Sequence, residues 1–211
     1  MRHTPVGRPV PTTYISTFKG NRFYPDEPRI DGIDIEDIAH GLAYQCRFNG
    51  QTAVFYSVAQ HSLMVASLLP PALQKAALLH DAAEAYLGDV VKPLKRLLPA
   101  FSRIEAGVTD LIAQAFGVDF GKPPVSQDEG GPPLAEGCAV YRAIKRADLV
   151  ALATEKRDLM PNSTEAWSYL SGIHPLPGVI QPLSPPEAKA AFLAAWAALP
   201  APPTQGFVHA H

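Results

Sequence analysis

Apolar residues recur every three or four positions along most of this chain, a spacing typical of helices that bury one face. The helices that this pattern predicts cover residues 34–44, 57–69, 71–86, 100–116, 134–159 and 186–199. Asp34 and Ser57 are suited to N-cap positions, and Ser57 with Gln60 fits a capping box. A further short helix is expected within residues 163–170. The pattern therefore predicts an all-α bundle of six or seven helices.

The segments outside these helices have other compositions. Residues 14–24 carry a central Lys-Gly-Asn turn and predict a small N-terminal hairpin. Residues 119–133 are rich in glycine and proline, which predicts an irregular loop insertion. The proline-rich residues 200–211 predict a flexible tail. Because 211 residues can be built around one hydrophobic core, we expect a single domain over residues 1–199.

Composition narrows the class of protein. Hydrophobic residues make up 47% of the chain and charged residues 18%, which indicates a globular rather than a disordered protein. The formal net charge of -2 supplies no basic field for a long nucleic acid, although a local pocket can still attract a small anion. The sequence has no membrane-length apolar run and no signal-peptide pattern. Cys46 and Cys138 lie far apart and form no metal-binding doublet, so we expect free thiols. Together, these features predict a cytoplasmic location without membrane association.

Polar residues stand where the helix over 71–86 should be apolar. His80 and Asp81 are adjacent, and Glu84 follows about one turn later, so a regular helix would place all three on one side. Burying an imidazole and two carboxylates together is costly unless a cation or a hydrogen-bond network compensates their charges. The sequence therefore predicts a metal site at this helix.

Two further residues repeat the pattern on other helices. His61 lies among apolar positions of the helix over 57–69, and Asp148 lies among those of the helix over 134–159. Taken alone, His61 could be an ordinary helix residue, and Asp148 could pair with Arg142 or Arg146. Together with His80 and Asp81 they form a set of two imidazoles and two carboxylates, which suits Mn, Co, Fe, Ni or Zn better than Ca.

The order His…His-Asp…Asp resembles the HD-domain phosphohydrolase superfamily over residues 14–159. More narrowly, the chain is similar to the small bacterial and prophage 5′-deoxynucleotidase-like members, and the segments that carry this similarity are residues 46–50, 55–61, 80–89 and 147–159. The resemblance implies an HD-domain helical bundle and one divalent transition metal. It implies that the metal ligands are His61, His80, Asp81 and Asp148, and that metal-activated water removes the 5′-phosphate of deoxynucleoside monophosphates.

Glu84 is the candidate for proton transfer, because it stands one turn from the predicted ligands and is not needed to complete their set. The resemblance agrees, since the corresponding Glu of the nucleotidases is catalytic. The alternative is a surface carboxylate on an amphipathic helix, which the small apolar neighbours of Glu84 disfavour. We therefore expect Glu84 to act with Asp81 and Arg47 as the catalytic residues.

Arg47 and Phe48 follow the helix over 34–44, and a guanidinium can bind a phosphate dianion through two hydrogen bonds. The resemblance implies that Arg47 contacts phosphate and that Phe48 packs on the nucleoside, where relatives commonly have Trp. The alternative is a loop arginine beside a core phenylalanine. Asp89 and Lys95 are expected to contact the sugar and the phosphate, with Lys92 less well supported.

The charged run at residues 155–158 is interpreted as a salt-bridged, solvent-facing turn. The expected partner of the protein is a small nucleotide. The alanine-rich residues 188–199 could also bury against a second subunit, so a homodimer is one expectation.

Two other functions compete with the monophosphatase. A deoxynucleoside triphosphate triphosphohydrolase of the dATP type would release tripolyphosphate, with Lys92, Lys95 and Arg96 as contributing cations. A non-catalytic nucleotide sensor would keep the metal pocket without turnover, although the complete set of site residues disfavours decay. A cyclic-nucleotide phosphodiesterase and a (p)ppGpp hydrolase fit the sequence less well.

Overall fold

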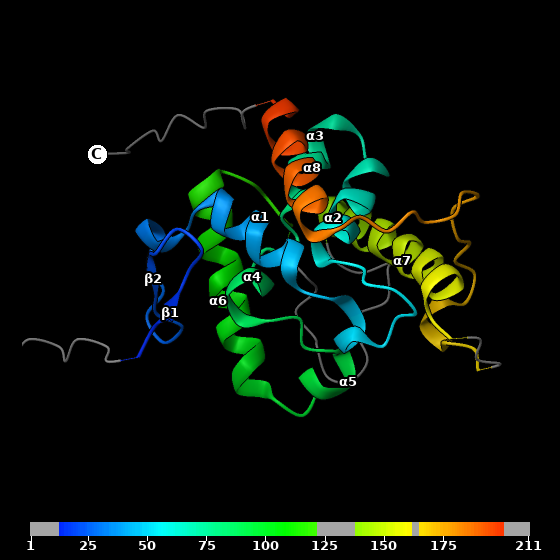
Figure 1. The fold of residues 1–211 in the computed structure, drawn as a ribbon, viewed down its shortest axis with the longest axis horizontal. Helices are drawn as coiled ribbons and strands as arrows, with labels where there is room; N and C mark the ends of the chain where they lie inside the picture. The colour runs from blue at the N-terminus through cyan, green and yellow to red at the C-terminus, as the bar shows by residue number, and fades with distance from the viewer. Residues whose placement is uncertain (1–12, 122–137, 162–164, 201–211) are drawn as a thin grey trace, which may run out of the picture.

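A computed structural model of the chain describes residues 13–121, 138–161 and 165–200. Within these ranges the fold is all-α, as predicted (Figure 1). Its helices are α1 (Ile35–Tyr44), α2 (Val58–Ser67), α3 (Pro71–Leu78), α4 (Glu84–Leu87), α5 (Lys92–Lys95), α6 (Pro99–Phe116), α7 (Ala139–Leu159) and α8 (Pro185–Ala198). These eight helices in the described part of the chain exceed the six or seven expected, because the helix over 71–86 is divided and α5 was not predicted. Short 3-10 turns occur at Ile30–Gly32, Arg47–Gly50 and Ser168–Leu170.

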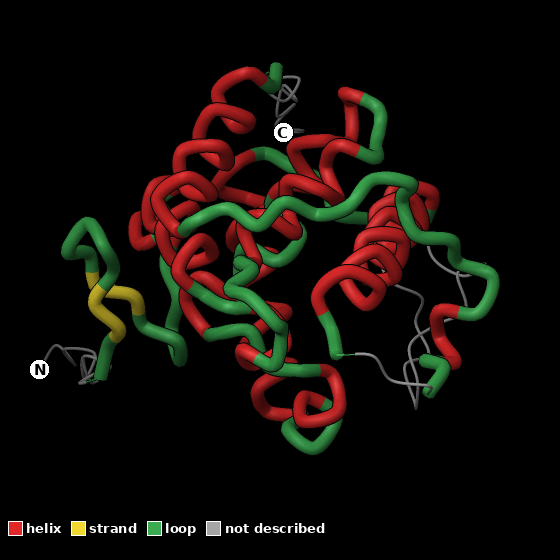
Figure 2. The backbone as a smooth tube through the Cα atoms, turned by 45° about the vertical axis from the view of Figure 1, so that its right-hand side comes forward, coloured by secondary structure: helices red, strands yellow, loops and turns green. Residues whose placement is uncertain are grey.

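The predicted N-terminal hairpin is present. Strands β1 (Ile15–Ser16) and β2 (Arg22–Phe23) pair in antiparallel fashion. Figure 2 shows this hairpin at the edge of the helical body. Phe23 is buried and its ring stacks on that of Tyr86, with the centroids 4.4 Å apart. The hairpin is therefore attached to the same short helix, α4, that begins at Glu84.

Side-chain caps start two of the central helices at the predicted residues. The Asp34 carboxylate accepts a hydrogen bond from the Glu36 backbone, and the Ser57 hydroxyl accepts one from the Gln60 backbone. The second half of the predicted capping box is wrong. The Gln60 side chain instead donates to the Gln181 carbonyl at 2.7 Å and accepts from the Leu183 amide at 2.8 Å. Gln60 thus fastens α2 to the segment that precedes α8.

The helix expected over 71–86 is interrupted between α3 and α4. Residues 79–83 form successive tight turns, in which the Ala82 amide bonds the Leu79 carbonyl and the Glu84 amide bonds the Asp81 carbonyl. The prediction that His80 and Asp81 lie on a regular helix is therefore wrong. Adjacent residues of an α-helix point about 100° apart. The interruption removes this constraint and lets two consecutive side chains reach one site.

The core lies between α1, α2, α3 and α8, with α7 packed against α2 and α3. Its fully buried side chains include Ile38, Leu42, Val58, Val65, Leu78 and Phe192. The final helix, α8, agrees closely with its prediction, whereas the 163–170 segment holds only the 3-10 turn at Ser168–Leu170. Most of the expected 119–133 loop, the expected start of the long helix at residue 134 and residues 201–211 of the tail lie outside the described residues.

None of the described helices combines the length and the apolar character that crossing a membrane would require.

Gly41 allows α1 and α4 to approach closely. A β-carbon at this position would lie 2.8 Å from the Ala85 carbonyl oxygen and 2.9 Å from the Ala85 β-carbon, both of which belong to α4. Neither atom is the end of a flexible side chain, so the two helices would have to separate. Because Ala85 follows Glu84, this close contact lies next to the candidate proton-transfer residue.

We expect Gly41→Ala to lower the free energy of unfolding by about 1–3 kcal/mol, because overpacking outweighs the gain in helix propensity. Gly107→Ala is the matched control, since Gly107 lies in α6 and a β-carbon there would meet no atom within 4 Å. The control should raise the free energy by up to about 1 kcal/mol. Urea unfolding measures the free energy of unfolding of both variants. Equal stability of Gly41→Ala and Gly107→Ala would contradict a close contact at Gly41.

Candidate metal centre

The four predicted ligands come from three parts of the fold. His61 lies on α2, His80 and Asp81 lie in the turns between α3 and α4, and Asp148 lies on α7. His61 Nε2 is 3.4 Å from Asp148 Oδ1 and 3.5 Å from Asp81 Oδ2, and the same Asp81 oxygen is 3.2 Å from His80 Nε2. One ligand atom each from His61, His80 and Asp148 lies within 4.8 Å of the others, so this group could hold a metal ion. Asp81 stands outside that triplet but contacts both imidazoles.

Both imidazoles are oriented by their Nδ1 atoms. His80 Nδ1 lies 2.8 Å from the Ala77 carbonyl, and His61 Nδ1 lies 2.7 Å from Glu155 Oε1. Because both partners are acceptors, Nδ1 carries the hydrogen and Nε2 is left with its lone pair when the ring is neutral. Both Nε2 atoms are buried and make no hydrogen bond. Two such nitrogens beside two carboxylates fit the donor set of a divalent transition metal.

The surrounding charges are arranged to keep the carboxylates ionised. Burial raises the pKa of Asp148, but the Lys145 ammonium and His61 outweigh it and hold that pKa well below its usual range. For His61, burial and Arg47 lower the pKa, but Glu155 and Asp148 outweigh them and raise it to about 9. In the metal-free protein His61 therefore holds a proton that a bound cation would displace.

Glu84 differs from its neighbours in favouring the protonated form. Its side chain is 9% exposed, and burial, followed by the nearby Asp81 carboxylate, raises its pKa well above the usual value. Lys95 opposes this shift from 4.0 Å, and Glu84 Oε2 makes no hydrogen bond. A buried carboxyl whose pKa is raised holds its proton to higher pH and can donate it to a leaving group.

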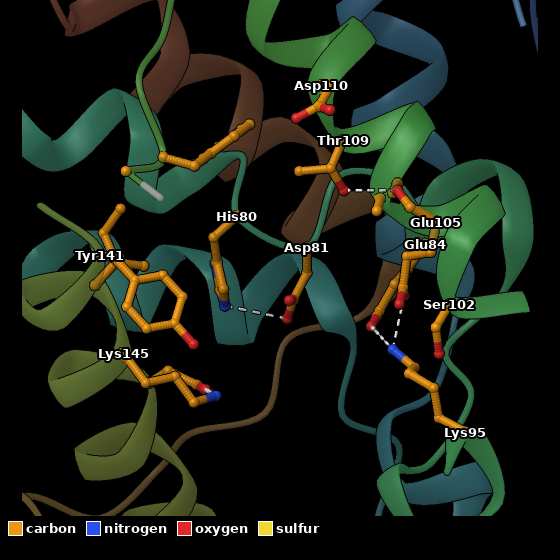
Figure 3. A pocket seen from close by; sticks show the side chains of 16 residues that line it. His80, Asp81, Glu84, Lys95, Ser102, Glu105, Thr109, Asp110, Tyr141 and Lys145 are labelled. Atoms are coloured by element: carbon orange, nitrogen blue, oxygen red, sulfur yellow. Dashed lines mark hydrogen bonds and ion pairs between the residues drawn. The ribbon is translucent and has the colours of Figure 1, made fainter. Parts of the chain in front are cut away.

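A cavity of about 520 Å³ opens from the centre between α6 and α7 (Figure 3). His80, Asp81, Glu84 and Asp148 are among the residues that line it. Glu105, Thr109 and Asp110 of α6 form one wall, and Tyr141 and Lys145 of α7 form the opposite wall. Lys95 also lines the cavity, where its ammonium lies 2.6 Å from Glu105. The volume is within the range of small-molecule sites.

Arg47, Phe48 and Asp89 do not line this cavity. Arg47 is held in a buried position, with Nη2 3.1 Å from Glu155 Oε2 and Nη1 3.7 Å from Asp81 Oδ2. Its guanidinium lies 5.2 Å from the centre of the Phe48 ring, and Phe48 lies beside Trp167. Burial raises the pKa of Asp89, although Arg47 opposes the rise. Of the four predicted substrate-binding residues, only Lys95 faces the cavity.

The backbone around Phe48 is unusual. Phe48 and Asn49 have φ values of 55° and 52°, in the left-handed region that residues other than glycine seldom adopt. Such conformations cost on the order of 1 kcal/mol or more each and persist only where the surrounding structure enforces them. The residue that precedes them, Arg47, is held by buried ion pairs to Asp81 and Glu155.

Sequence reasoning missed two residues of the site. The prediction of a solvent-facing turn at 155–158 is wrong for Glu155, whose side chain is fully buried. Lys145, for which the sequence predicted no role, contacts Asp148 and lines the cavity. Both lie on the face of α7 that carries Asp148, three residues before it and seven after it. That spacing is the signal that could have identified them.

Comparison with known proteins identifies relatives for most of the chain. The uncharacterized protein YfdR of Escherichia coli is 40% identical over 161 residues, which cover 76% of this chain and 80% of YfdR. An uncharacterized protein of Rhodobacter capsulatus is 36% identical over 182 residues, which cover 80% of this chain and 86% of that protein. No protein-family model matches the sequence. The chain belongs to the family of YfdR.

The raised pKa of His61 predicts that metal binding depends on pH. Below about pH 9 the metal-free His61 is protonated, so a cation must displace a proton and its affinity should fall as the pH falls. We expect the dissociation constant for Mn²⁺ to rise by about tenfold per unit between roughly pH 8 and 6. Calorimetric titration in buffers of different ionisation enthalpy would count the released protons. An affinity that is constant over this range would contradict the assignment of His61 as a ligand.

Proposed function

We propose that the protein is an HD-type, metal-dependent phosphohydrolase that removes the 5′-phosphate from deoxynucleoside monophosphates. The observation that carries this proposal is the pair of buried His61 and His80 Nε2 atoms without hydrogen bonds. They lie beside Asp81 and Asp148, and these two carboxylates line a cavity together with His80. The order of these residues in the sequence, which resembles the HD superfamily, supports the same assignment. The family of YfdR adds no activity to this argument, because neither relative's name states one.

His61, His80, Asp81 and Asp148 are the proposed ligands of one ion, which we take to be Mn, Co, Zn, Fe or Ni. A bound divalent ion supplies a Lewis acid that polarises a phosphoryl oxygen and lowers the pKa of water. The backbone carbonyl of Ala77 and the carboxylate of Glu155 hold the two imidazoles in place for this purpose. Asp81 contacts both imidazoles, and its Oδ2 lies 3.7 Å from Arg47 Nη1.

Glu84 is the proposed proton donor. Its carboxyl faces the cavity beside Asp81, and its raised pKa favours the protonated form that a general acid needs. The leaving 5′-oxygen of a nucleotide requires a proton as its bond to phosphorus breaks. Lys95, 4.0 Å from Glu84, would stabilise the carboxylate that remains after the transfer.

Lys145 and Lys95 are the proposed phosphate-binding residues of the cavity, and they come from opposite walls (Figure 3). Arg47 does not line the cavity, but its Nη1 lies 3.7 Å from Asp81 Oδ2, and we propose that its positive charge attracts the phosphate toward Asp81. The described lining holds only these two lysines beside five acidic side chains, namely Asp81, Glu84, Glu105, Asp110 and Asp148, of which Glu84 favours its neutral form. This balance supports a monophosphate dianion over the more highly charged triphosphate, because the extra charge would face carboxylates.

A panel of deoxynucleoside and ribonucleoside mono- and triphosphates tests the proposal. With Mn²⁺ or Co²⁺ added, we expect release of inorganic phosphate from deoxynucleoside monophosphates and its loss with a chelator. Glu84→Gln should lower kcat by about 10²–10⁴-fold. It should leave metal binding intact, because the amide preserves the shape of the side chain. Tripolyphosphate as the product would instead establish a triphosphohydrolase, and binding without turnover would establish a sensor.

Lys145→Met tests the phosphate-binding role. Loss of a charged hydrogen-bond donor should raise KM by about tenfold or more. Metal affinity should hold or increase, because the ammonium that pairs with Asp148 is gone. Lys189→Met is the control, since Lys189 lies on α8 outside the cavity and pairs with Glu36. Steady-state kinetics separate the two variants, and an unchanged KM for Lys145→Met would remove this residue from the phosphate site.

A further inference from the structure

We infer that Glu155 is a positioning residue of the site, which holds the metal ligand His61 and the candidate phosphate-binding Arg47 through one buried carboxylate. This inference rests on the proposed metal centre. Glu155 itself is proposed to contact neither the cation nor the substrate.

The two oxygens of Glu155 are used separately. Oε1 lies 2.7 Å from His61 Nδ1, and Oε2 lies 3.1 Å from Arg47 Nη2. The side chain of Glu155 has no exposed surface, and neither has that of His61. A buried carboxylate is costly unless its charge is compensated, and Arg47 supplies that compensation. The result is a chain of contacts from Arg47 through Glu155 to His61.

Glu155 and Asp148 lie on the same helix, seven residues apart. This separation is close to two turns, so α7 directs both carboxylates toward α2. Asp148 Oδ1 approaches Nε2 of His61, and Glu155 Oε1 approaches Nδ1 of the same ring. One helix thus contacts both nitrogens of a single imidazole and defines the plane in which it lies.

The two candidate imidazole ligands are held by different means. His80 depends on the backbone carbonyl of Ala77, which lies three residues before His80 in the same segment. His61 depends on a side chain from another helix. A carboxylate acceptor also increases the donor strength of an imidazole more than a neutral carbonyl does. Glu155 should therefore affect metal affinity as well as ring orientation.

Glu155 also holds Arg47, the candidate phosphate-binding residue. Its Nη2 is fixed by Glu155, which leaves Nη1 near Asp81 Oδ2 at 3.7 Å. The left-handed backbone at Phe48 and Asn49 directly follows this residue. Without Glu155 the guanidinium would lose its closest acceptor and its orientation beside Asp81. A purely structural ion pair would instead influence stability alone.

Metal titrations of Glu155→Gln and Glu155→Ala test the inference, with Glu36→Gln as the control. Glu36 is a partly exposed carboxylate on α1 that pairs with Lys189. We expect Glu155→Gln to bind Co²⁺ about 10–100-fold more weakly than the wild type, because the amide can accept from His61 but carries no charge. Glu155→Ala should be weaker still and should alter the visible spectrum of bound Co²⁺. The control should match the wild type.

A second measurement does not depend on the variants folding. In zinc-loaded wild-type protein with ¹⁵N-labelled histidine, the His61 ring should carry its proton on Nδ1 and bind zinc through Nε2. Zinc on Nδ1, or a His61 ring with no Nδ1 proton, would overturn the inference. So would a folded Glu155→Gln protein with wild-type affinity for Co²⁺.

The outcomes also separate this inference from the proposed function. If the wild type binds metal and the Glu155 variants bind it weakly, but no nucleotide is hydrolysed, Glu155 keeps its role and the phosphohydrolase assignment fails. If nucleotides are hydrolysed and the Glu155 variants bind metal normally, the phosphohydrolase assignment stands and the role of Glu155 fails. If the wild type binds no metal, both are overturned.

Discussion

The structure depends on the mutual compensation of charges that are buried where α2, α7 and the turns after α3 meet. His61 and Glu155 have no exposed side-chain surface, and Arg47 has little. A buried ion without a partner would cost several kcal/mol, so each of these groups can be present only because the others are. Arg47 compensates Glu155, Glu155 binds His61, and Lys145 compensates Asp148. The fold brings three segments together, and this network compensates the charges of the polar side chains that they bury.

Much of this arrangement was accessible from the sequence, because local rules determined it. Apolar periodicity indicated the helices, and the N-cap residues Asp34 and Ser57 marked two of their starts correctly. The grouping of His61, His80 and Asp148 followed from polar residues at core positions. Each of these inferences uses residues within one element or a polar residue that conflicts with its apolar surroundings.

The predictions that were wrong concern contacts between distant segments. Gln60 had the right spacing for a capping box, but its amide bonds residues more than a hundred positions away. Glu155 stood in a charged run, which ordinarily indicates solvent, and its burial is explained by Arg47 and His61 from other parts of the fold. The interruption at 79–83 was hidden because its residues have no helix-breaking glycine or proline. The interruption places the consecutive side chains of His80 and Asp81 at one centre, where His80 Nε2 lies 3.2 Å from Asp81 Oδ2.

The side chain of Gln60 gives the C-terminal part of the chain a role that its position would not suggest. Gln60 directly precedes His61, and its amide group is fastened by the backbone of Gln181 and Leu183. Shortening the protein ahead of these residues would leave that amide without its partners and remove the outer support of α2. The backbone that leads into the final helix thus supports the start of α2, where His61 lies, although residues 181–198 do not line the cavity.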